Sequence, residues 1–190
     1  TKGGVTATFL QFAMNNDWTV PAVELSPAKP IGSTILIADT GRKGQAAQAK
    51  ALLEKGQRVL AVDPFFFGES KIKRRDFLHV LLVHAVGERA LGIQSSQIAA
   101  IAGWVKKEHG HSPSLTAIGP RLGVAARIAA VQEQVISSIE LHQPMVSLKE
   151  VIEKNRGANH VPELMCFGLL EQFDLPQIEA LIAPRKVEKR

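Results

Sequence analysis

The pattern of apolar and polar positions changes once along the chain, near residue 30. Before that point, residues 6–14 and 18–25 are rich in β-branched, aromatic and other apolar side chains, and the polar residues 15–17 separate them. This arrangement is typical of an antiparallel β-hairpin. Pro21 has no backbone N–H to donate to a ladder, which favours a position at the edge of a sheet.

After residue 30, short apolar runs alternate with helical patterns. Buried strands are predicted at 34–38, 58–62, 115–118 and 135–141. Helices are predicted at 45–55, 95–108 with Ser95 as N-cap, 122–133, 147–154, 162–173 and 174–182. Apolar strands separated by helices predict a mostly parallel sheet covered on both faces. We therefore expect one α/β domain over residues 1–190, with the four strands as parallel neighbours and the hairpin as an antiparallel edge.

The turn at residues 119–123 has the most specific sequence. Gly119-Pro120-Arg121-Leu122-Gly123 joins an apolar strand to an Ala-rich helix. A Gly-x-Ser-x-Gly turn in this context presents a nucleophilic serine above a sheet, and its glycines, here Gly119 and Gly123, leave space beside the turn. Arg121 occupies the serine position. An arginine side chain has no lone pair with which to attack a carbonyl.

The composition of the chain argues against several classes of function. No window has the roughly 18 apolar residues of a membrane span, and no secretory signal is visible. The net charge of +5 is scattered outside 71–75 and 185–190, and aromatic residues are few, so no nucleic-acid partner is expected. The single cysteine, Cys166, excludes an internal disulfide and is expected to be a buried structural thiol. A cytoplasmic location is compatible with these features, as is a longer precursor, because the first residue is not Met.

Two further segments carry a resemblance to a known superfamily. Residues 58–70 resemble the stretch that precedes the nucleophile in α/β-hydrolases, and residues 173–185 resemble the segment before the acid of the acetylxylan-esterase-like branch. With the hairpin and the turn, the resemblance extends over nearly the whole chain. It implies a three-layer α/β-hydrolase-type sandwich, a carboxylic-ester hydrolase lineage, a small ester or carboxylate as ligand, and no cofactor.

The resemblance also assigns roles to residues. It implies that the backbone N–H of Gly41 or Arg42, with that of Leu122, forms an oxyanion hole. The acid and the histidine should follow residues 183–185, but the sequence continues only to Arg190, so all three triad positions are expected to be substituted or absent. This departure predicts a weakly active or non-catalytic domain.

The sequence is also compatible with other roles for these residues. A rearranged site would draw on serines and histidines near the same end of the sheet: Ser70, Ser95, Ser96, His142 and His160. Arg121 could instead bind a carboxylate or an acetylated sugar, or form an ion pair with Asp39, Asp63 or Glu69. The pair His109 and His111 is a weak zinc signal, so no metal is expected. Residues 41–44 do not match a phosphate-binding loop.

Overall fold

The computed structural model describes the whole chain except residues 1–2, 16, 73 and 75, and contains a seven-stranded sheet. Its order is β1-β2-β4-β3-β5-β6-β7, and the five strands from β4 to β7 run parallel. The bounds are β1 Val5–Met14, β2 Trp18–Pro27, β3 Gly32–Ala38, β4 Gln57–Val62, β5 Ser114–Ile118, β6 Ser138–His142 and β7 Lys186–Lys189. The predicted parallel core, β4-β3-β5-β6, is confirmed.

The N-terminal hairpin is confirmed as the antiparallel border of the sheet. β1 is the outermost strand, and β2 lies between β1 and β4. The prediction that Pro21 marks an edge strand is therefore wrong. Pairing between β2 and β4 begins at Ala22, so the missing N–H of Pro21 falls just beyond that ladder. The carbonyl of Pro21 still accepts a hydrogen bond from the N–H of Asp63 at 3.1 Å.

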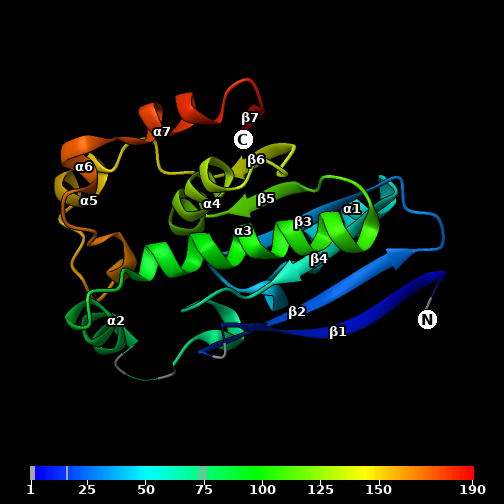
Figure 1. Cartoon of the computed structure of the whole chain (residues 1–190), viewed down its shortest axis with the longest axis horizontal. Helices are drawn as coiled ribbons and strands as arrows, with labels where there is room; N and C mark the ends of the chain where they lie inside the picture. Colours follow the sequence, from blue (N-terminus) through cyan, green and yellow to red (C-terminus); the bar gives the residue numbers. More distant parts are fainter. Residues whose placement is uncertain (1–2, 16, 73, 75) are drawn as a thin grey trace.

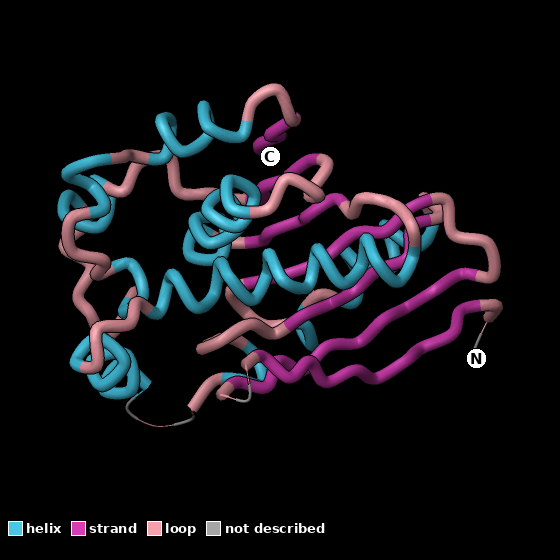
Figure 2. The backbone as a smooth tube through the Cα atoms, in the orientation of Figure 1, coloured by secondary structure: helices cyan, strands magenta, loops and turns pink. Residues whose placement is uncertain are grey.

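Helices cover both faces of the sheet unequally (Figure 1). α3 (Ala90–His109) and α4 (Pro120–Gln132) pack on one face, over the main apolar core. On the other face, α1 (Ala46–Glu54) packs Ala49 and Leu52 against Leu36 of β3 and Val59 of β4. Figure 2 shows α3 running the length of the sheet. The expected three-layer sandwich is thus present.

Several boundaries differ from the predictions. α3 starts at Ala90 rather than near Ser95, which lies inside the helix, fully buried, and donates to the carbonyl of Gly92. β6 starts at Ser138 rather than at 135. α2 (Asp76–Ala85) lies in a stretch for which no helix was predicted.

The C-terminal third forms a cap of short elements whose buried apolar side chains join the main core. It contains α5 (Lys149–Glu153), the 3₁₀ turn η3 (Pro162–Leu164), α6 (Leu169–Gln172) and α7 (Leu175–Ile182). The predicted helix over 162–173 is instead two short pieces, η3 and α6, separated by residues 165–168. Gly168, with a φ of 81°, stands directly before α6 in a left-handed conformation. The predicted last helix is present as α7, and Asp174 and Gln177 form a capping box at its start. Arg185 then donates to three carbonyls around the end of α4, those of Ala130, Glu133 and Ile136.

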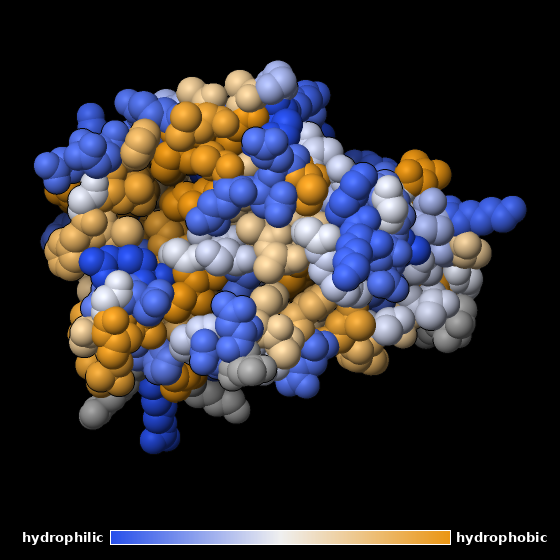
Figure 3. Space-filling model, viewed as in Figure 1, coloured by the Kyte–Doolittle hydropathy of each residue, from blue (hydrophilic) through white to orange (hydrophobic). Residues whose placement is uncertain are grey.

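The surface over this cap is apolar in places. Figure 3 shows apolar side chains gathered over the end of the molecule that contains α5 to α7. Exposed members include Val146, Ile152 and Phe167. None of the described helices is long and apolar enough to cross a membrane.

Candidate functional site

The turn between β5 and α4 is sharp and depends on one glycine. Gly119 has φ 106° and ψ 159°, and α4 begins immediately after it at Pro120. A Cβ at Gly119 would lie 2.4 Å from Cγ of Asp39, so no larger residue fits. Gly123 does not have the steric role predicted for it, because a Cβ there would lie an ordinary 3.6 Å from Nη1 of Arg127.

Asp39 lies against the N-terminus of α4. It follows β3 directly, and its two carboxylate oxygens accept hydrogen bonds from the N–H groups of Arg121 (3.0 Å) and Leu122 (2.8 Å). A carboxylate is favoured at this end of a helix because the first N–H groups are unpaired and the helix dipole is positive there. Burial raises the pKa of the Asp39 carboxyl above its usual value, while the two N–H donors act in the opposite direction.

The side chain of Arg121 is held by a buried acid. Its Nε and Nη2 donate to the two oxygens of Glu163 at 2.5 and 2.6 Å, a bidentate pair. Glu163 is 0% exposed and Arg121 18% exposed. The guanidinium also lies 4.7 Å from the ring centre of Phe67. Asp39, one of the expected partners, accepts a hydrogen bond from the backbone N–H of Arg121 rather than from its side chain. The acid that pairs with the guanidinium, Glu163, was not predicted.

The loop after β3 is held by a network of hydrogen bonds and ion pairs. The N–H of Gly41 donates to the carbonyl of Ala38 at 2.8 Å, and that of Arg42 donates to Oδ1 of Asp63 at 2.7 Å. The Arg42 guanidinium pairs with both Asp63 and Glu69. Asp63 is fully buried, and this network supplies the counter-charge that a buried carboxylate requires.

The serines and histidines proposed for a rearranged site have other partners. Ser70 donates to the carbonyl of Asp63 at 2.8 Å. His142, the last residue of β6, contacts Glu140 through Nε2 at 2.9 Å, and its carbonyl accepts from Gly119. His160 lies in the cap loop, where its N–H donates to the carbonyl of Gly157.

A serine–histidine contact does occur at the opposite end of the sheet. Ser33, at the start of β3, lies 2.9 Å from Nε2 of His111, whose Nδ1 contacts the carbonyl of His109. Ser33 is only 4% exposed. His109 in turn contacts Glu24 at 2.8 Å. Among the described residues, no group of three potential metal ligands is present around these histidines or elsewhere.

The sequence predictions missed Glu163 and the position of Asp39. A signal for Glu163 existed: it is a lone acid in the apolar stretch Val161-Pro162-Glu163-Leu164-Met165. An acid buried among apolar residues requires a cation or several donors. Nothing in the sequence identified Arg121 as that cation, since the two residues are 42 positions apart.

Comparison with known proteins gives similarity only at the level of structure. No family model matches the chain. No curated protein sequence matches it either. The chain is similar in structure to a candidate acetyl xylan esterase from Bacteroides fragilis, with a TM-score of 0.83 and 17% identity over 100% of this chain. It spans only 60% of the length of that protein.

Two further solved structures are similar over most of the chain. One is a cold-adapted esterase from an Arctic intertidal metagenomic library, with a TM-score of 0.61, 16% identity, and coverage of 100% of this chain and 86% of that one. The other is a thermostable carboxyl esterase from Bacillus coagulans, solved with glycerol, with a TM-score of 0.56, 16% identity, and coverage of 90% and 59%. At these identities the likeness establishes the architecture alone: the chain has an α/β-hydrolase-type fold.

Proposed function

We propose that this chain is an α/β-hydrolase-type domain of carboxylic-ester hydrolase lineage in which the catalytic turn has become a structural junction. Its acetylxylan-esterase-like sequence segments and its esterase-like fold support the lineage. The side chains at the turn support the loss of catalysis. The domain would then serve as a scaffold or binding module rather than as a hydrolase.

One observation carries this proposal. The N–H groups assigned to an oxyanion hole by resemblance, those of Gly41, Arg42 and Leu122, all donate to acceptors within the protein. Two of these acceptors are the carboxylates of Asp39 and Asp63. An oxyanion hole needs donors aimed at the oxygen of the substrate. Here a carboxylate already occupies the N-terminus of α4.

The backbone at the turn supports the same conclusion. In a nucleophile elbow, the nucleophile sits on a strained strand-to-helix turn that exposes its side chain. Here the positive φ falls on Gly119, which has no side chain, whereas Arg121 belongs to the first turn of α4. Neither position supplies a nucleophile. Loss of a nucleophile and its base typically removes about 10⁶-fold in rate.

The two alternatives have less support. A carboxylate-binding site at Arg121 needs a free guanidinium edge, and its Nε and Nη2 already bind Glu163. A rearranged esterase needs a serine next to a histidine beside a cavity. Ser70 and His142 have separate partners, and Ser33 is buried at the other end of the sheet.

The test is hydrolysis of p-nitrophenyl acetate combined with labelling by a fluorophosphonate probe. We expect hydrolysis at the buffer rate and no labelled serine. Ser33→Ala serves as a control, because Ser33 is the one serine whose hydroxyl contacts a histidine ring among the residues that the structure describes. Stoichiometric labelling of a serine together with turnover would overturn the proposal. Labelling lost in Ser33→Ala would identify that pair as the site.

A further inference from the structure

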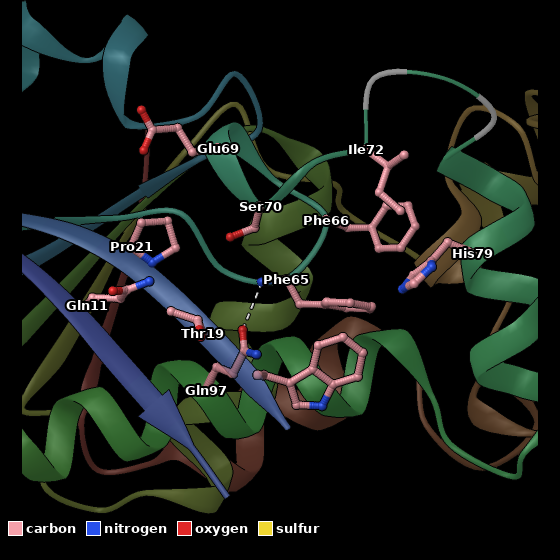
Figure 4. A pocket seen from close by; sticks show the side chains of 11 residues that line it. Gln11, Thr19, Pro21, Phe65, Phe66, Glu69, Ser70, Ile72, His79 and Gln97 are labelled. Carbon is pink, nitrogen blue, oxygen red and sulfur yellow. Dashed lines mark hydrogen bonds between the residues drawn. The ribbon is translucent and has the colours of Figure 1, made fainter. Parts of the chain in front are cut away.

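A pocket of about 420 Å³ lies outside the closed turn, between the end of the hairpin, the loop after β4, and α2 (Figure 4). Its volume falls in the range of small-molecule sites. One wall is aromatic and consists of Trp18, Phe65, Phe66 and His79. None of these residues takes part in the network around Asp39 and Arg121, so the pocket calls for a separate explanation.

The aromatic wall is held by contacts between its own rings. Trp18 meets Phe65 edge-to-face, with 4.5 Å between ring centres, and Phe65 meets Phe66 in the same way at 4.9 Å. His79 on α2 lies 5.5 Å from Phe66 and 5.7 Å from Phe65. Edge-to-face pairs of this kind fix the orientation of the rings. An aromatic ligand entering the pocket would therefore meet an ordered surface.

The backbone of the same wall is clamped by two buried amides of α3. Gln97 accepts from the N–H of Phe65 at 2.8 Å, as drawn in Figure 4, and Gln94 donates to the Phe65 carbonyl at 3.1 Å. Phe66 has φ 73°, a strained conformation for a bulky residue. Such strain persists only where the surroundings enforce it, and it clusters at ligand-binding sites. The wall is thus pre-organised, which reduces the entropic cost of binding.

The opposite wall is polar. Figure 4 shows Gln11, Thr19 and Ser70 on the other side of the pocket from Phe66 and His79. Glu69 also lines the pocket, but its carboxylate is paired with Arg42 and Lys43 at 2.5 and 2.7 Å. A cationic ligand would have to compete with two cations for this acid. The lining therefore favours an uncharged ligand with an aromatic ring at one end and a hydroxyl group at the other.

We propose that this pocket binds a neutral aromatic alcohol or phenol. The ring packs against the wall formed by Trp18, Phe65 and His79, and the hydroxyl group exchanges hydrogen bonds with Thr19 and Gln11. This site goes beyond the proposed loss of catalysis and does not depend on it, because the two involve different side chains. Binding at the pocket together with hydrolysis would overturn only the proposed loss of catalysis. The absence of both binding and hydrolysis would overturn only the proposed pocket.

The two tryptophans of the chain provide a direct assay. Trp18 lines the pocket, whereas Trp104 packs against Phe12 and His109 elsewhere. Each gives one indole N–H resonance in the NMR spectrum of the wild-type protein, and Trp104→Phe assigns them. The probes are benzyl alcohol, benzoate and benzylamine, which share a ring and differ in charge.

We expect benzyl alcohol to shift the Trp18 resonance saturably and to leave that of Trp104 unchanged, with benzoate and benzylamine binding more weakly. Thr19→Val should weaken binding by about threefold to tenfold, the loss of one neutral hydrogen bond. Thr8→Val, at an exposed position of β1 outside the pocket, should leave it unchanged. The proposal would be overturned if no saturable shift occurred, or if both tryptophans shifted equally. It would also be overturned if benzylamine bound most tightly, or if Thr19→Val bound with wild-type affinity.

Discussion

Replacement of Arg121 by Met removes the only bidentate partner that the structure gives to Glu163 within its described residues. Glu163 is fully buried, so the variant must bury an unpaired carboxylate. Breaking a buried pair in this way costs about 3–5 kcal/mol. Because Arg121 is 18% exposed, some water can reach the site, and we expect a loss near the lower value, about 3 kcal/mol at pH 7. For a domain of this size, that corresponds to a fall in Tm of roughly 6–12 °C.

The measurement is urea unfolding followed by circular dichroism, for Arg121→Met, Glu163→Leu and the double variant. The double variant should recover most of the loss, because two apolar groups leave no buried charge. Lowering the pH should also reduce the loss in Arg121→Met, because a protonated carboxyl is less costly to bury. Lys154→Met is a matched control that breaks an exposed ion pair, and it should cost no more than about 0.5 kcal/mol. A loss below about 1 kcal/mol in Arg121→Met, or additive effects in the double variant, would refute the reasoning.

Two further predictions concern the same turn. Gly119→Ala places a Cβ 2.4 Å from Cγ of Asp39 and should cost about 3 kcal/mol or more in urea unfolding. Gly123→Ala, whose Cβ would make only ordinary van der Waals contacts inside a helix, should be neutral or stabilise by up to about 1 kcal/mol. Similar values for the two variants would contradict this account of the turn. Burial raises the pKa of Asp39 above 3.8, so the folded protein retains a proton that the unfolded chain has released. The contribution of Asp39 to stability is then present at low pH and lost as the pH rises through the folded-state pKa. The measurement is the free energy of unfolding of the wild type and of Asp39→Asn as a function of pH. The wild type should lose stability relative to the variant as the pH increases. The opposite slope would exclude a raised pKa.

The sequence predicted the sheet well because its strands are short, apolar and separated by clear helical periods. The same local signals failed where a tertiary contact decides the outcome. Ser95 resembles an N-cap, but burial against the core extends α3 five residues earlier, to Ala90. The apolar stretch 162–173 resembles a helix, but the backbone of Gly168 takes positive φ.

Prediction of the site failed for a related reason. The junction of β5 and α4 lies within the predicted segment 119–123, although α4 begins at Pro120 rather than at 122. An ion pair of Arg121 was among the alternatives considered. The partner was not found, because Glu163 lies in a loop whose path depends on packing of the cap. Asp39 was considered as a side-chain partner of Arg121, yet it binds the backbone of α4. Local sequence indicates which groups need partners, but only the fold shows which groups meet.

The two borders of the sheet differ in a way that affects how copies of the protein can associate. β7 is four residues long, and three of them are charged, which opposes the addition of another strand. β1 offers ten residues with no charge and no proline, and most of its side chains are exposed, including Phe9. No described strand pairs with its outer side. Self-association by extension of the sheet is therefore open at β1 and disfavoured at β7, and sedimentation at rising protein concentration would register it.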